Sequence, residues 1–156
     1  MAKVILMSGV SGSGKSTIVD AMTDKDPFVV VCSADDWFLD SKGVYRFNPA
    51  ELGNAHGECL RKFTNALIGA EKKGTEPTIV VDNTNSTVVE LAPYVALAQA
   101  YKATIELVNV KCDPKVAHAR NSHGVPLQGI KRMAAAIESR RLPPFWTVKV
   151  TEIVTS

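Results

Sequence analysis

The stretch GVSGSGKS, residues 9–16, decides the fold. It matches the pattern GxxxxGK[ST], whose glycines let the backbone turn so that successive N–H groups point at one anion. The apolar run Lys3–Ser8 before it predicts a buried strand, and Lys15–Thr23 after it predicts a helix whose dipole points at the same place. A chance match in this strand–loop–helix setting is rare, so the sequence predicts a nucleoside triphosphate site.

The residues of this loop suit the parts of a bound triphosphate. Lys15 can reach the β- and γ-phosphates, the Ser16 hydroxyl can ligate Mg²⁺, and Thr17 is placed to donate to the α-phosphate. We therefore expect ATP and Mg²⁺ as cofactors. The loop residues expected to bind the nucleotide are Gly12, Ser13, Gly14, Lys15, Ser16 and Thr17.

Strands alternate with helices along the rest of the chain, which is typical of a parallel sheet with helices on both faces. The further expected strands are Phe28–Ser33, Thr78–Val81, Thr104–Lys111 and Thr147–Val154. The further expected helices run from Asn48-Pro49 to Gly74, from the third strand to about Lys102, from Pro114 over a short segment, and from Pro126. Residues 34–48 show no period, and a loop of that length is usually functional.

Composition excludes several classes of protein. With 156 residues, 46% of them hydrophobic and 22% charged, the chain suits one globular domain, residues 1–156, rather than a disordered or coiled-coil protein. Its apolar runs are too short to cross a bilayer, and Met1-Ala2-Lys3 leads directly into the first strand, so we expect no membrane partner, no signal peptide and a cytoplasmic location. Three cysteines without a CxxC spacing indicate packed thiols in a reducing compartment.

The net charge of +2 hides a division along the chain. Residues 1–110 carry 10 Lys and Arg against 13 Asp and Glu, whereas residues 111–149 carry 8 against 2. A basic C-terminal third predicts a surface for phosphates, either those of ATP alone or also those of a nucleic acid. The residues of this third expected to contact DNA are Lys131, Arg132, Arg140 and Arg141.

Two carboxylates, Asp35 and Asp36, directly follow the second expected strand. Because the carboxyl ends of parallel strands lie on the same edge as the phosphate loop, these side chains should face the γ-phosphate. An Asp at this place can orient an acceptor hydroxyl and take its proton, and we favour Asp35 for the role. The alternative is that either carboxylate only caps the following turn.

Two further segments reach the same edge. Asp82, which opens the run Asp82–Asn85 after the third strand, is placed to hold a water of Mg²⁺, although Asn and Thr at such a turn are also ordinary caps. Ser16 and Asp82 are therefore the expected metal-site residues. Arg120, at the end of the short helix after the fourth strand, can neutralise charge on a transferring phosphoryl group, or it is a solvated surface residue.

Four segments taken in order, GVSGSGKST, ADDWF, VVDNTN and RNSHGVP, resemble the polynucleotide-kinase branch of small P-loop kinases. The order and spacing agree over about residues 3–140. The resemblance implies a P-loop NTPase fold of the α/β class, with a five-stranded parallel sheet of adenylate-kinase type, helices on both faces and a small lid at about residues 114–127. It also implies transfer of the ATP γ-phosphate to a hydroxyl, typically the 5′-hydroxyl of a nucleic-acid end.

The resemblance assigns roles residue by residue. Residues 15–17 would bind ATP and Mg²⁺, Asp35 would be the general base, and Asp82 would belong to the Asp-x-Thr-Asn loop. Arg120 would reach the ATP phosphates from the lid. The expected catalytic residues are therefore Lys15, Asp35 and Arg120.

One position departs from the resemblance. End-phosphorylating members place an arginine shortly after the Asp pair, whereas Trp37-Phe38-Leu39 carries no charge. Either another basic residue such as Arg46 takes over, or the acceptor differs. Trp37 and Phe38 suit stacking on a nucleobase, or they simply pack in the core. The residues expected to bind the acceptor are Asp35, Asp36, Trp37, Phe38, Arg46 and Asn85.

We expect an ATP-dependent kinase that acts on a hydroxyl of a nucleic acid, with DNA favoured. The acceptor is a 5′-hydroxyl end or a hydroxymethylated pyrimidine base, as in relatives that modify phage DNA, and a phage protein acting in the host cytoplasm fits the second case. Two alternatives stay open: a kinase of a small nucleoside or sugar, and an ATP-binding regulatory module with little turnover. The sequence names no protein partner.

Overall fold

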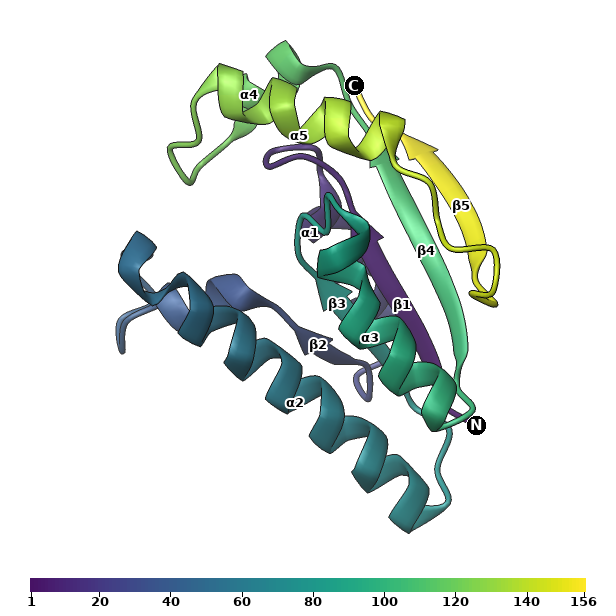
Figure 1. Ribbon diagram of the computed structural model, residues 1–156. Helices are drawn as coiled ribbons and strands as arrows, with labels where there is room; N and C mark the ends of the chain where they lie inside the picture. The colour runs from purple at the N-terminus through teal and green to yellow at the C-terminus, as the bar shows by residue number, and fades with distance from the viewer.

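Five parallel strands form one twisted sheet in the computed structural model, which describes residues 1–156 (Figure 1). The strand order is β2-β3-β1-β4-β5. The strands are β1 (Lys3–Ser8), β2 (Val30–Cys32), β3 (Thr78–Asp82), β4 (Thr104–Lys111) and β5 (Lys149–Val154). The expected α/β fold with a five-stranded parallel sheet is therefore confirmed.

Helices cover the sheet on both faces. They are α1 (Lys15–Lys25), α2 (Leu52–Lys73), α3 (Val88–Ala100), α4 (Pro114–Arg120) and α5 (Leu127–Ser139), with two short 3₁₀ turns, η1 (Ala34–Phe38) and η2 (Pro49–Glu51). Figure 1 shows α2 and α3 on one side of the sheet and α1 on the other, while α5 crosses near the carboxyl end of β4. None of these helices combines the length and apolar character needed to span a lipid bilayer.

Alternation along the strands divides the core into two layers. Leu6 and Leu107 face α2 and α3 with Phe63 of α2, which is completely buried. Met7 and Val108 face the opposite side, where α1 contributes Val19. The central strands are covered on both faces and read as continuous apolar runs, which is why sequence pattern alone located them.

The longest helix, α2, begins and ends where its sequence signals lie. The side chain of Asn48 accepts a hydrogen bond from the Ala50 N–H at 3.1 Å, but the first turn after it is the 3₁₀ turn η2 rather than α-helix. Gly74 ends the helix in the left-handed conformation, with φ 64°. The stripe that α2 buries is Ala55, Cys59, Phe63, Leu67 and Ala70.

The two edge strands are shorter than the sequence predicts. Phe28, expected in the second strand, is 82% exposed, and its N–H bonds to the Asp26 side chain in a turn. Thr147, expected in the fifth strand, lies before its start at Lys149. Each edge strand pairs with one neighbour only, β2 with residues 79–81 of β3 and β5 with residues 106–111 of β4, so the pairing covers only part of the neighbouring strand.

The carboxyl edge of the sheet collects the segments that carry the sequence motifs. The pairing of Met7 with Asp82 sets the end of β3 beside the end of β1, from which the phosphate loop continues into α1. η1 follows β2, and the segment containing α4 follows β4. These four connections therefore meet over one edge, where doubly wound sheets bind their ligands.

Candidate active site

The phosphate loop needs glycine at two positions. Gly12 and Gly14 have φ angles of 82° and 101°, in the left-handed region that other residues adopt only with strain. A Cβ atom on Gly12 would also overlap the carbonyl oxygen of Ala117 in α4. The loop can therefore keep its shape and pack against α4 only with glycine at position 12.

Lys15 points its ammonium back into this loop. Its Nζ donates to the carbonyl oxygens of Gly9 and Val10, both at 2.9 Å. The side chain is buried, and burial lowers its pKa to about 8, although the nearby carboxylates of Asp82 and Asp35 act in the opposite direction. An anion placed over the loop would supply the negative charge that this buried cation lacks.

Ser16 and Asp82 offer oxygen atoms suited to a magnesium ion. The Ser16 hydroxyl donates to Oδ2 of Asp82 at 3.3 Å. Burial raises the pKa of Asp82, while Lys15 and the Ser16 hydroxyl lower it. A hydroxyl and a carboxylate beside a phosphate cradle form a hard oxygen donor set, which is the set that Mg²⁺ prefers. The residues present therefore fit both a nucleoside triphosphate and Mg²⁺.

A cavity of about 410 Å³ opens over the loop, and no hydrophobic residue lines it. We call it the phosphate cavity. The expected site residues that line it are Gly12, Gly14, Lys15, Ser16, Thr17, Asp35, Asp82 and Arg120. Ser13 is fully buried beneath the loop, and its hydroxyl has no hydrogen-bond partner. The structure thus brings together residues from four separate connections of the sheet.

Arg120 lies at the rim of the phosphate cavity and is held by the C-terminal residues. Its guanidinium donates to the Cys112 sulfur at 2.9 Å and to the Thr155 hydroxyl at 3.3 Å. Thr155 in turn donates to the carbonyl of Ser13 at 2.6 Å. Thr155 therefore supports both Arg120 and the phosphate loop. The sequence carries no signal for these contacts.

Asp35 is fixed from two sides. The side-chain oxygen of Asn83, at the end of β3, accepts a hydrogen bond from the Ala34 N–H at 2.9 Å and so holds the start of η1. The Ser33 hydroxyl accepts from the Asp35 N–H at 3.3 Å. Tyr45 donates its hydroxyl to Oδ1 of Asp35 at 3.2 Å.

A second cavity, of about 600 Å³, adjoins the first. We call it the aromatic cavity, because Phe38, Tyr45 and Phe47 form part of its wall. Phe38 packs edge-on against both other rings, with centroid distances of 6.0 Å and 5.0 Å. Ser11, Asp35, Asn83, Thr84 and His123 line both cavities. Asp35 therefore lies at the junction between them.

Five of the residues expected to bind acceptor or DNA lie elsewhere. Trp37 and Asp36 line a different hollow beside Lys62, and burial raises the pKa of Asp36. Arg46 is paired with Asp40 at 3.0 Å and lines neither cavity. The remaining two are Asn85 and Arg140.

Asn85 and Arg140 form an internal support for the carboxyl edge. Asn85 is 1% exposed, and its side chain donates to the Met7 carbonyl at 2.8 Å. Arg140 is half-buried and donates to Ser8 Oγ at 2.8 Å, to the Asn85 carbonyl at 2.7 Å and to Asn109 Oδ1 at 2.6 Å. Expecting Arg140 on the DNA surface is therefore corrected: its donors are taken by the protein.

Sequence reasoning missed three residues of the site. Asn121 connects the lid to the phosphate loop, since its Oδ1 accepts from Ser11 Oγ at 3.2 Å and from the His123 N–H at 2.8 Å. Tyr45 and His123 come together over Asp35 although they lie far apart in the chain. Asn in a polar loop is a turn signal, but the pattern gives no partner for either ring.

A family comparison agrees with this arrangement. Residues 4–125 match a family model described as an AAA domain, AAA_33. The chain belongs to this family. The chain is 36% identical over 134 residues to human NEDD4-binding protein 2, a match that covers 83% of the chain and 7% of that relative. It therefore spans only a small part of the relative's length.

Solved structures share the fold of this AAA domain. A chain of the Pnkp1/Rnl/Hen1 RNA repair complex superposes with a TM-score of 0.66 at 20% identity, over 88% of this chain and 44% of that chain. A gluconokinase from Sinorhizobium meliloti superposes with a TM-score of 0.58 at 14% identity, over 99% and 83% of the two chains. The chain therefore has the fold of P-loop kinases.

Proposed function

We propose that the protein is a kinase that transfers the γ-phosphate of ATP to a hydroxyl of a nucleic acid, at a 5′-hydroxyl end or on a hydroxymethylated pyrimidine of DNA. The position of Asp35 carries the proposal. Its carboxylate lines both the phosphate cavity and the aromatic cavity, so a hydroxyl that it binds lies between a donor site and an acceptor site.

The donor side follows from the loop. The N–H groups after Gly12 and the ammonium of Lys15 would hold the β- and γ-phosphates, with Lys15 exchanging two carbonyl partners for phosphate oxygens. Ser16 and Asp82 would hold Mg²⁺, which when bound neutralises charge on the phosphate oxygens. Arg120 at the rim would stabilise the transferring group.

The transfer itself needs one proton acceptor. The acceptor oxygen forms a bond to the γ-phosphorus, and the bond from that phosphorus to the β–γ bridging oxygen breaks, so that ADP leaves with the electron pair. The hydroxyl proton passes to the carboxylate of Asp35. Positioning and charge neutralisation supply the remaining catalysis, because phosphoryl transfer asks for little other covalent chemistry.

The aromatic cavity favours a nucleic-acid acceptor over a sugar. Phe47 is 50% exposed and offers a ring on which a planar base can stack, with the buried ring of Phe38 packed behind it. Arg132 of α5, an exposed cation with no ion-pair partner, lies on the same wall and can meet a phosphate of the strand. A sugar would leave most of this aromatic surface without a planar partner.

An acceptor panel tests the proposal. The protein is incubated with γ-labelled ATP and 5′-hydroxyl DNA, 5′-hydroxyl RNA, hydroxymethylcytosine DNA, free nucleosides or gluconate, and mass spectrometry locates the phosphate. We expect phosphate on an oligonucleotide, and none with Lys15→Met, which controls for contaminating kinases. Transfer only to gluconate or a nucleoside would identify a small-acceptor kinase, and ATP binding without any transfer would identify a regulatory module.

A further inference from the structure

Two rings from distant parts of the chain close over Asp35. Tyr45 lies in the loop between η1 and η2, and His123 lies in the lid loop between α4 and α5. Their rings are stacked, with centroids 4.1 Å apart and 14° between the planes. Nδ1 of His123 lies 3.7 Å from Oδ2 of Asp35, while Oδ1 receives the Tyr45 hydroxyl.

We propose that Tyr45 and His123 form a clasp that positions Asp35, so that the contact between the two loops sets the orientation of the base. Both are positioning residues, because they act through the Asp35 carboxylate. The inference rests on the proposed function, in which Asp35 takes the proton of the acceptor hydroxyl.

The two oxygens of Asp35 differ in their surroundings. Oδ1 already accepts a hydrogen bond from Tyr45, whereas Oδ2 has no donor within hydrogen-bonding distance. Burial and the Asp35 charge raise the pKa of Tyr45 to about 12, so the phenol stays a donor and does not compete as a base. The clasp therefore directs Oδ2 toward the incoming hydroxyl.

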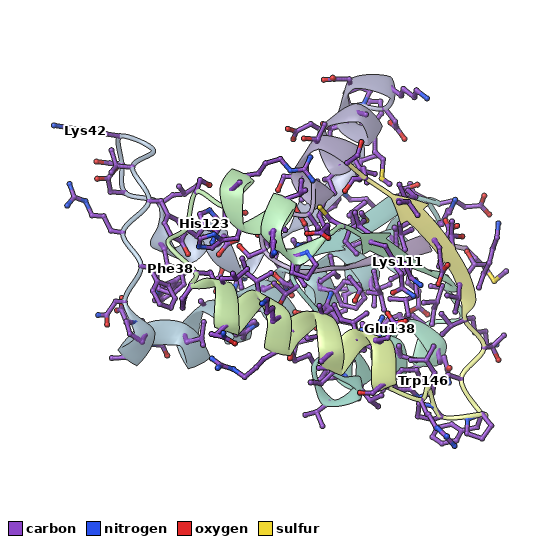
Figure 2. The ribbon with its side chains drawn as sticks, turned by 90° about the horizontal axis from the view of Figure 1, so that it is seen from above. Phe38, Lys42, Lys111, His123, Glu138 and Trp146 are labelled. Carbon is purple, nitrogen blue, oxygen red and sulfur yellow. The ribbon has the colours of Figure 1, made fainter.

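The acceptor-loop side of the clasp is firmly held. The Phe38 carbonyl accepts a hydrogen bond from the Arg46 N–H at 2.8 Å, and Leu39 pairs with Tyr45 in an antiparallel bridge. Phe38 itself is only 4% exposed and packs edge-on against Tyr45. Figure 2 shows Phe38 and His123 next to each other, while Lys42 lies at the tip of the loop, away from them.

The lid side of the clasp connects to the phosphate loop. Asn121 receives the His123 N–H at 2.8 Å and the Ser11 hydroxyl at 3.2 Å on the same oxygen. Its side-chain nitrogen donates to the Val125 carbonyl at 2.9 Å. A contiguous chain of contacts thus runs from the loop that holds phosphate, through Asn121, to the ring that stacks on Tyr45.

Steady-state kinetics test the clasp. The variants are His123→Ala, which removes the stack, His123→Phe, which keeps a ring but no nitrogen, and Tyr45→Phe, which keeps the ring but loses the hydrogen bond to Asp35. The matched control is His118→Ala, because His118 is an exposed imidazole on α4 that lines neither cavity.

The clasp predicts a loss in kcat rather than in ATP binding. His123→Ala should lower kcat about ten- to hundredfold, since misplacing a reacting group by an ångström costs that much. His123→Phe should recover most of the loss, and His118→Ala should match the wild type. KM for ATP should stay nearly constant in all of them. Equal rates for His123→Ala and His118→Ala, or equal losses for His123→Ala and His123→Phe, would overturn the proposal.

NMR spectroscopy tests the clasp independently of the identity of the acceptor. The chain has three histidines, so substitution assigns their ring protons in an NMR spectrum. We expect the His123 ring protons to be shifted upfield by the Tyr45 ring and to lose that shift in Tyr45→Leu; an unshifted resonance would overturn the clasp. If the wild type phosphorylates no nucleic acid, the proposed function fails. The clasp is then tested by comparing the rates of ATP hydrolysis of the same variants, a reaction in which water is the acceptor.

Discussion

The burial of Lys15 is unfavourable for the stability of the free protein. Lys15 is only 8% exposed, and its ammonium has two backbone carbonyls as partners. Its lowered pKa records the unfavourable burial of a charge without a strong counter-ion. Phosphates would remove this deficit on binding, which makes the residue a source of ligand affinity.

The pH dependence of stability should reveal this burial. The pKa of Lys15 in the folded protein lies near 8, below its ordinary value of 10.5, so the unfolded chain binds more protons between those values and stability rises with pH there. The free energy of unfolding of the wild type minus that of Lys15→Met should therefore increase by about 2 kcal/mol between about pH 7 and pH 9.5. Urea denaturation without nucleotide measures this difference in unfolding free energy at each pH. A difference that does not change with pH would contradict the burial argument.

Arg140 should matter for folding and not for binding. Arg140→Met keeps an apolar stem but leaves Ser8, Asn85 and Asn109 without their donor, which should cost about 3 kcal/mol of unfolding free energy. Arg141→Met makes the same charge change at an exposed neighbour and should stay within about 0.5 kcal/mol of the wild type. Chemical denaturation compares them; equal stabilities would refute the internal role of Arg140.

Among the elements, the phosphate loop and α4 fit together at Gly12. The backbone there has a positive φ angle and lies directly against the Ala117 carbonyl. A side chain at this position would have to displace α4, and with it the lid loop that carries His123. The position of the lid is therefore set partly by the loop.

Gly12→Ala should weaken ATP binding much more than a comparable backbone change elsewhere. Gly74 also has a positive φ angle, but a Cβ added there meets nothing within 4 Å. Gly74→Ala should therefore lose about 1 kcal/mol of stability and keep its ATP affinity, whereas Gly12→Ala should lose at least about tenfold in affinity. Isothermal titration calorimetry with ATP measures the affinity of both variants. Equal affinities for Gly12→Ala and Gly74→Ala would show that the contact with α4 is unimportant.

The elements also show how far sequence reasoning reaches. The bounds of β1, β4 and the start of α1 were predictable because continuous apolar runs and the phosphate loop have strong local signatures. The starts of β2 and β5 were not, because in each case the strand-like sequence pattern begins before the first residue that pairs with the neighbouring strand. Asp35, Asp82 and Lys15 were placed correctly at one edge by the rule for parallel sheets.

Contacts between distant loops lay beyond the sequence pattern. Tyr45 and His123 are separated by half of the chain, and stacking has no period or spacing that marks its partners. Asn85 and Arg46 had the right residue types for a ligand, but Asn85 is buried and donates to a backbone carbonyl, and Arg46 forms a surface ion pair with Asp40. Residue type predicts chemistry, whereas tertiary contacts decide which residues remain free to perform it.

At the scale of the whole molecule, the acidic and basic parts of the chain both contribute charged residues to the carboxyl edge of the sheet. The carboxylates of Asp35 and Asp82 come from the acidic part of the chain, and Arg120 and Arg132 come from the basic part. Both parts meet over the carboxyl edge of the sheet. A near-neutral protein can therefore place opposite charges where a phosphate, a metal ion and an acceptor would come together.

The central claim is that Asp35 takes the acceptor proton at the junction of the two cavities. Its direct test is to measure the transfer of labelled γ-phosphate to a 5′-hydroxyl or hydroxymethylcytosine oligonucleotide by the Asp35→Asn variant. Asn keeps the size of the side chain but cannot take the proton, so kcat should fall about 10²- to 10⁴-fold, with ATP affinity unchanged. Asp36→Asn, altering a neighbour outside both cavities, should retain the wild-type rate. A wild-type rate for Asp35→Asn, or an equal loss for Asp36→Asn, would contradict the claim.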